Sequence, residues 1–192
     1  MKTITKKFEI YNLDELEQSA KKRAISDIEE REASDFTPEY VIEEWNEKLI
    51  KLGYLNPKIA YSGFNSQGSG ASFTATVDLA TWLKAHTLGN TYRKLLNVSE
   101  EVELKVMRFN SSGNYVHEYS TTTEVIGYLG TEEVDEQTDS IVKLIDDEIV
   151  TLNKELYRDI EADYDHCTSE QSAIELIETN DYIYLKDGTI FA

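Results

Sequence analysis

The stretch from residue 58 to residue 79 constrains the fold more than any other part of the sequence. From Ala71 to Asp78 it alternates strictly between apolar and polar side chains. This period of two, rich in β-branched and aromatic residues, predicts a half-buried strand. Residues 59–64 predict a partner strand, and the intervening loop, residues 65–70, contains two glycines that permit backbone angles other residues resist. We therefore expect a β-hairpin at the centre of a sheet.

The segment before this hairpin predicts one strand and two helices. Residues 3–10 alternate apolar and polar side chains and predict a strand. Asn12 is suited to cap a helix, because Glu15 follows in the capping-box position. A second helix is predicted from Pro38, a favoured first helical residue, to Gly53, a favoured helix end.

The segment after the hairpin predicts further strands before the chain becomes helical. These are a second hairpin over residues 101–109 and 115–128, and a terminal hairpin over 182–191 with an Asp-Gly turn. The predicted fold class is α+β, with a mostly antiparallel sheet of about five or six strands covered by amphipathic helices, one of them long, acidic and C-terminal. No linker, repeat or low-complexity tract divides the chain, so residues 1–192 are expected to form a single domain.

The long helix is predicted from its apolar repeat. From Ile141 to Tyr164 apolar residues recur every three or four positions, which predicts a helix beginning near Asp139. A single apolar stripe implies one packed side, with acidic residues on the other faces. The candidate protein-interaction residues are Asp146, Asp147, Glu148, Glu155, Asp159, Glu161 and Asp163.

Charge points to the kind of partner. The chain has 37 acidic and 19 basic residues, a formal net charge of -18, and residues 132–192 hold 18 acidic against 4 basic ones. Such a field repels nucleic acid and membrane surfaces and favours a basic protein partner. The alternative is that the helices simply carry solvated acidic faces. No apolar run long enough for a membrane span and no signal peptide are present, so a cytoplasmic protein is expected.

The loop of the central hairpin is the second candidate site. Its backbone amides and serine hydroxyls suit a small phosphorylated or nucleotide ligand. It lacks the lysine of a P-loop, and the glycines are equally explained by turn geometry alone. The candidate ligand-binding residues are Gly63, Asn65, Ser66, Gln67, Gly68, Ser69, Gly70 and Ser72.

Catalytic and metal chemistry are not indicated. The chain has 3 histidines without a metal-ligand spacing and 1 cysteine, which excludes an intramolecular disulfide. His117 is expected to pack across strands. No Ser/His/Asp or Cys/His arrangement can be proposed, so we expect a non-enzymatic protein without a cofactor.

Two segments resemble a known family. They are the run YSGFNSQGSGASF at residues 61–73 and a C-terminal part that begins TSEQSAI at Thr168 and ends in a Lys-Asp-Gly turn. Both are similar to small acidic phage and prophage proteins often labelled "antitoxin of toxin–antitoxin stability system", and the order of parts is similar along most of the chain. The resemblance implies a phage or prophage origin, a bacterial host and a non-enzymatic role. Where that family commonly has an acidic residue between the loop glycines, this chain has Ser69.

Two classes of function follow as expectations. In the first, the protein binds a host or toxin protein with a basic surface, as an antitoxin-like or anti-defence protein, including by nucleic-acid mimicry. In the second, it binds a small phosphorylated ligand through the residue 63–72 loop. The sequence indicates no direct nucleic-acid or membrane binding and gives no oligomeric state.

Overall fold

The computed structural model describes residues 1–64, 66–109, 116–127 and 132–191. The chain forms two compact units, one made of Met1–Pro38 and Ala162–Ala192, the other of Glu39–Glu161. Each unit is described separately below. The expectation of a single domain over residues 1–192 stays a prediction.

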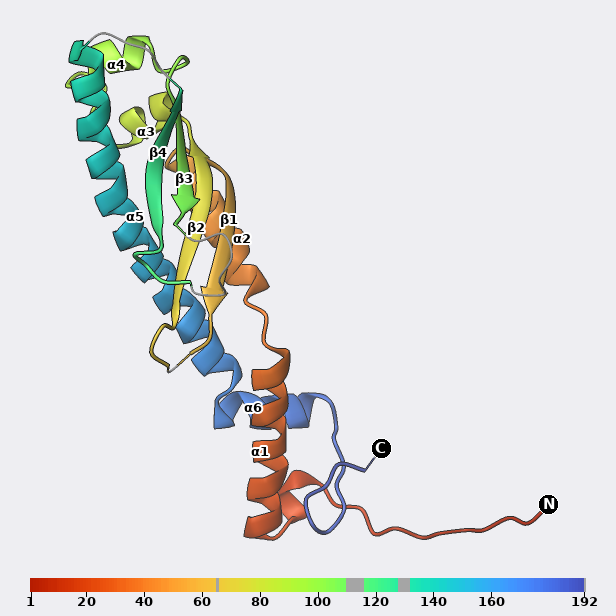
Figure 1. Ribbon diagram of the computed structural model, residues 1–192. Helices are drawn as coiled ribbons and strands as arrows, with labels where there is room; N and C mark the ends of the chain where they lie inside the picture. The colour runs from red at the N-terminus through yellow and green to blue at the C-terminus, as the bar shows by residue number, and fades with distance from the viewer. Residues whose placement is uncertain (65, 110–115, 128–131, 192) are drawn as a thin grey trace. The chain divides into compact units, whose positions relative to one another are not determined.

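The larger unit is built on an antiparallel sheet (Figure 1). Its described strands, in spatial order, are β1 (Tyr54–Ser62), β2 (Gly70–Val77), β3 (Glu103–Arg108) and β4 (Thr121–Gly127). The central hairpin is confirmed, because Ile59 of β1 pairs with Phe73 of β2. Pro57 lies where the β1 register shifts, on an edge strand, where the missing N–H costs least. The α+β class is thereby confirmed, with four strands in the described residues rather than five or six.

The missing strands are those predicted at the two ends of the chain. Residues 3–10 form no strand, and residues 182–191 contribute only isolated bridges, Tyr11 to Tyr184 and Tyr184 to Ile190. Alternation creates two faces, but a strand also requires a neighbouring backbone to pair with. Within the described residues these ends have such a neighbour only at single positions.

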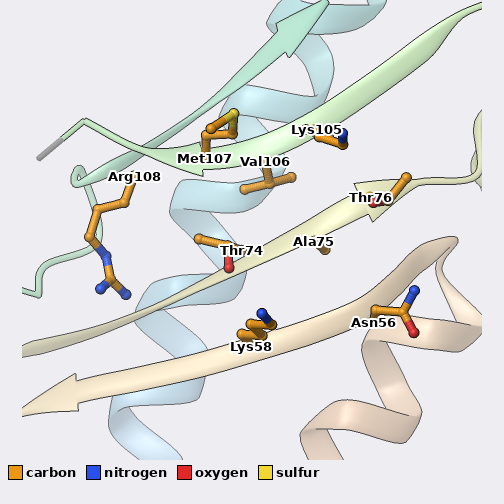
Figure 2. Close-up of a pocket in the computed structure, with 9 residues that line it drawn as sticks. All are labelled: Asn56, Lys58, Thr74, Ala75, Thr76, Lys105, Val106, Met107 and Arg108. Atoms are coloured by element: carbon orange, nitrogen blue, oxygen red, sulfur yellow. The ribbon is translucent and has the colours of Figure 1, made fainter. Parts of the chain in front are cut away.

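Helices cover one face of the sheet. They are α2 (Glu39–Lys51), α3 (Leu79–Ala85), α4 (Arg93–Asn97) and the part of α5 (Glu132–Cys167) that belongs to this unit. Phe73 and Leu104 are fully buried on the covered face. Figure 2 shows α2 and α5 behind the strands, with the polar side chains of β1, β2 and β3 on the opposite, open face.

The long acidic helix is confirmed, but it begins at Glu132 rather than near Asp139. Val134 and Thr138 extend the buried stripe by two turns, and the Thr138 hydroxyl donates to the Val134 carbonyl at 2.8 Å. Because Thr138 is polar, the apolar repeat by itself does not predict the first two turns of the helix. The apolar residues of the stripe are Ile141, Ile145, Ile149, Leu152, Leu156 and Ile160, all buried.

The smaller unit packs α1 (Gln18–Asp35) against α6 (Glu170–Thr179). Asn12 and Glu15 make the expected capping-box contact, since the Asn12 amide donates to Glu15 Oε2 at 2.8 Å. The element they open is a short 3₁₀ turn, η1 (Leu13–Glu15), and α1 begins only at Gln18. The core residues are Leu13, Leu16, Ala20, Ala24, Ile25, Ile28, Ala173, Ile177 and Tyr184.

The terminal Asp-Gly turn closes against this core. Gly188 has φ +85°, and a Cβ there would lie 2.3 Å from the Ala20 carbonyl oxygen. Only glycine fits this position without displacing backbone. Across the described residues, none of the helices is sufficiently long and apolar to cross a membrane.

Candidate interaction surfaces

The acidic residues of α5 point in different directions. Each residue turns the helix by about 100°, so neighbouring carboxylates at Asp146, Asp147 and Glu148 cannot share one face. The structure divides the seven predicted interaction residues into carboxylates that contact other parts of the protein and one that faces solvent.

Asp146 ties α5 to strand β4. Its carboxylate accepts hydrogen bonds from the Thr123 backbone amide at 2.7 Å and the Thr122 hydroxyl at 3.1 Å. β4 is the last strand in the order of the described sheet, so this amide has no strand partner on its outer side among the described residues. A carboxylate there satisfies a backbone donor of the sheet edge.

Glu148 is the centre of a polar cluster beneath α3. Its Oε2 accepts from the Tyr54 hydroxyl at 2.6 Å and from the Trp82 indole N–H at 2.7 Å. Its Oε1 lies 2.7 Å from His86 Nε2. One carboxylate therefore connects β1, α3 and α5.

The neighbours of Glu148 are arranged as donors. Burial, reinforced by the nearby Glu148 charge, raises the pKa of the Tyr54 hydroxyl far above its ordinary value, so Tyr54 stays protonated and donates. His86 Nδ1 lies 2.8 Å from the Trp82 carbonyl, and the imidazole stacks on the Trp82 ring with centroids 4.1 Å apart. Both ring nitrogens of His86 thus face acceptors, which fits a histidine that holds the carboxylate in place.

Other acidic side chains of α5 contact α2 or α5 itself. Asp159 accepts from the Trp45 indole N–H at 2.8 Å, and Glu155 pairs with Lys48 at 3.1 Å. Lys48 Nζ also lies 3.7 Å from the centroid of the Trp45 ring. Two further contacts join Glu161 to the Tyr157 hydroxyl and Asp163 to the Cys167 thiol.

Cys167 is not an activated thiol. Burial and the neighbouring Asp163 carboxylate raise the pKa of its thiol above the ordinary value. A raised pKa lowers the thiolate fraction, and the thiolate is the reactive form.

The interpretation of these seven carboxylates as simply solvated therefore does not hold for Asp146, Glu148, Glu155 and Asp159, which contact other elements of the larger unit. Partner binding by the seven residues stays a prediction. Only Asp147 is exposed with no side-chain contact among the described residues. It aligns along the helix with three exposed carboxylates outside the predicted set. We call Glu132, Glu136, Asp139 and Asp147 the outer acidic face.

The outer acidic face has little neutralising charge. Within the described part of the chain none of its four carboxylates makes an ion pair, although Lys143 lies in the same row. The adjacent Glu133 does pair with Lys94. Glu132, Glu136 and Asp139 are spaced about one per helical turn, whereas Asp139 and Asp147 are about two turns apart, with Lys143 between them.

The hairpin loop uses its hydroxyls internally. Ser62 Oγ lies 2.9 Å from the Gly68 carbonyl and 2.8 Å from the Val116 carbonyl. Ser66 and Ser69 bond through their hydroxyls at 2.9 Å, and the Ser66 amide donates to Ser69 Oγ at 3.0 Å.

The glycines and remaining candidates of the loop serve packing as well. Gly63 and Gly68 have φ of +42° and +98°, and a Cβ on Gly70 would meet the His117 Cα at 2.9 Å. Ser72 is buried in β2, and Gln67 is exposed. Asn65 lies outside the described residues. These contacts favour a structural role for the loop, while ligand binding there stays a prediction.

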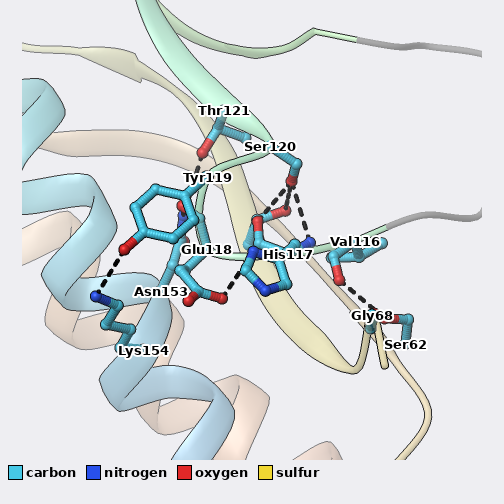
Figure 3. Close-up of polar contacts among 11 residues, drawn as sticks. Ser62, Gly68, Val116, His117, Glu118, Tyr119, Ser120, Thr121, Asn153 and Lys154 are labelled. Atoms are coloured by element: carbon cyan, nitrogen blue, oxygen red, sulfur yellow. Dashed lines mark hydrogen bonds and ion pairs between the residues drawn. The ribbon is translucent and has the colours of Figure 1, made fainter. Parts of the chain in front are cut away.

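The loop packs on the turn that precedes β4 (Figure 3). His117 lies in this turn and not across strands as expected. Its Nδ1 is 2.9 Å from the Glu118 carboxylate, and its ring stacks on Tyr119. Lys154 of α5 donates to the Tyr119 hydroxyl at 3.1 Å.

Asn153 joins this turn and β2 to α5, and it is fully buried. Its Oδ1 accepts from the Phe73 amide at 3.2 Å. Its Nδ2 donates at 3.1 Å to the Glu118 carbonyl and to the Thr121 hydroxyl. This buried amide on the apolar stripe therefore satisfies polar groups of three separate segments.

The open face of the sheet carries a shallow groove of about 780 Å³. Figure 2 shows its polar side chains projecting from β1, β2 and β3. The lining residues are Asn56, Lys58, Thr74, Ala75, Thr76, Lys105, Val106, Met107 and Arg108.

Residues 38–170 match the model of a protein family described as a domain of unknown function (DUF8835). The match covers more than half of the 192 residues. The chain belongs to this family. Neither a curated protein nor a solved structure matches it.

The family region contains the whole larger unit. The outer acidic face, the Glu148 cluster, the loop and the groove therefore all lie within it. Of these, sequence reasoning found the loop and Asp147, and it missed the role of His86 and the groove. A usable signal for Glu148 existed, because it stands three residues after Ile145 and four before Leu152, beside the buried stripe.

Proposed function

We propose that the protein is a non-enzymatic binding protein whose outer acidic face docks onto a basic surface of a host or toxin protein. The observation that carries the proposal is the division of the α5 carboxylates. Asp146, Glu148 and Asp159 are occupied by contacts within the unit, whereas the four residues of the outer acidic face are exposed and make no ion pair among the described residues. A rigid helix holds the latter in a fixed row.

The chemistry of the row favours a protein partner. Unneutralised carboxylates on one face steer and orient a positively charged partner. Their mean spacing between Glu132 and Asp147, about 7.5 Å of helix per carboxylate, is wider than the spacing along a DNA strand, about one phosphate per 3.4 Å. The spacing therefore supports electrostatic docking more than close nucleic-acid mimicry. An antitoxin-like or anti-defence role, which rests on the resemblance to phage proteins, is the biological form we propose.

Charge reversal on the outer face tests the proposal. We expect Glu136→Lys/Asp139→Lys/Asp147→Lys to lose the proteins that the wild-type chain captures from a bacterial lysate at low salt. The reason is that three attractive charges become repulsive at the contact. The measurement is quantitative mass spectrometry of the captured proteins at low and moderate salt.

A matched control distinguishes an effect of the outer acidic face from an effect of the total charge. Asp14→Lys/Glu17→Lys/Glu30→Lys changes the net charge equally at exposed positions outside α5. The control should capture the same basic proteins as wild type, with capture falling as salt rises. Equal capture by the outer-face variant and the control would contradict the proposal.

A further inference from the structure

The groove on the open face differs in charge from the rest of the molecule. Its lining contains three cations, Lys58, Lys105 and Arg108, and no acidic residue, in a chain whose formal net charge is -18. Hydroxyl groups lie between the cations. Lys58 of β1 pairs with Thr74 of β2, and Thr76 pairs with Lys105 of β3.

Two of these cations have N–H donors that bind no other described residue. Lys58 is exposed, and its side chain makes no hydrogen bond or ion pair to any other described residue. Arg108 makes a side-chain hydrogen bond from Nη2 to Ser72 Oγ, at 3.3 Å. A guanidinium has five N–H donors, so most of its capacity is unused by the described residues. Lys105, by contrast, is paired with Glu103 at 2.7 Å and lies opposite Glu124.

We propose that this groove binds a small phosphate-bearing molecule, with the phosphate held between Lys58 and Arg108 and contacted by the Thr74 hydroxyl. Lysine, arginine and hydroxyl donors that line the same groove match the acceptor oxygens of a phosphate. The lining contains no aromatic side chain, so it offers no stacking platform for the bases of a single-stranded nucleic acid. This site lies on the open face of the sheet; it adjoins the residue 63–72 loop only through the contact of Arg108 with Ser72, and it is independent of the outer acidic face.

Direct contacts must supply the affinity at this site. The overall negative field repels anions at long range. A phosphate therefore binds favourably only where the charge of nearby cations outweighs this repulsion. The ligand is consequently a compact one that reaches Lys58 and Arg108 together. A long polyanion would extend over Glu103 and Glu124, which flank Lys105.

Isothermal titration calorimetry with inorganic pyrophosphate and with ADP, at constant ionic strength, tests the site. We expect at least one of the two to bind the wild-type chain and Lys58→Ala to weaken that binding about tenfold, as for loss of one charge-assisted contact. Thr74→Val should weaken it less. Binding of ADP alone would assign recognition to the organic part together with the phosphates, and binding of both would assign it to the phosphates.

The control is Lys143→Ala, which removes the same charge from an exposed position on α5 and should bind like wild type. Thermal melting would confirm that the variants fold. Three results would overturn the proposal: no binding of either compound at millimolar concentration, equal weakening by Lys143→Ala and Lys58→Ala, or loss of binding in Ser69→Ala with none in Lys58→Ala. The last result would place the ligand at the loop.

Discussion

Replacing Glu148 with alanine is expected to lower the free energy of unfolding by about 3 kcal/mol. The substitution leaves the Trp82 indole N–H and the Tyr54 hydroxyl without their carboxylate acceptor. An unsatisfied buried donor costs about 1–3 kcal/mol, and the loss of the His86 contact adds to it. Urea denaturation followed by circular dichroism measures the change.

The adjacent residue supplies the control for this experiment. Asp147→Ala removes the same charge one residue away, from an exposed side chain. Exposed substitutions usually change stability by no more than about 0.5 kcal/mol. If Asp147→Ala and Glu148→Ala were equally stable, the Glu148 cluster would not stabilise the fold.

Replacing Asn153 with alanine should cost a similar amount, about 2–4 kcal/mol. The side chain is fully buried and bonds the Phe73 amide, the Glu118 carbonyl and the Thr121 hydroxyl. Truncation leaves these groups unpaired and opens a cavity on the α5 stripe. The shift of the urea midpoint reports the loss.

Lys154→Ala, at the next position, is the comparison for Asn153→Ala. Lys154 is exposed and bonds the hydroxyl of Tyr119, so its removal should be nearly neutral. An Asn153→Ala protein as stable as Lys154→Ala would contradict the role of this amide.

The regular parts of the fold follow from local pattern. The hairpin of β1 and β2 was predictable because its alternation and glycine loop specify both strands and their connection. The middle of α5 was predictable because a stripe from Ile141 to Ile160 specifies a helix in almost any context. Residues 3–10 carry a similar alternation, interrupted by Lys6, yet form no strand, because pairing depends on a distant backbone that no local pattern describes.

The candidate sites were less predictable because polar side chains are assigned by tertiary contacts. Asp146, Asp147 and Glu148 are consecutive and chemically alike, but the first binds β4, the second faces solvent and the third binds Tyr54 and Trp82. The sequence predicts their directions around the helix, because each residue turns it by about 100°. It does not predict which residues they contact. Lys58 and Arg108 line one groove only because β1, β2 and β3 pair in register, and the sequence pattern does not predict the pairing of β2 with β3.

The most direct test of the division among the α5 carboxylates compares two variants that each remove three negative charges. Asp146→Asn/Glu148→Gln/Asp159→Asn neutralises carboxylates bound to other elements, and Glu136→Gln/Asp139→Asn/Asp147→Asn neutralises part of the outer acidic face. Each contains two Asp→Asn changes and one Glu→Gln change.

The measurement is the free energy of unfolding of both variants in urea at the same salt concentration. We predict a loss of at least about 3 kcal/mol for the first, because charge-assisted hydrogen bonds are weakened at three places. We predict a change within about 1 kcal/mol for the second, because its side chains are exposed and relief of like-charge repulsion offsets small losses. Equal losses in the two variants would contradict the division between carboxylates that hold the fold together and carboxylates that remain for a partner.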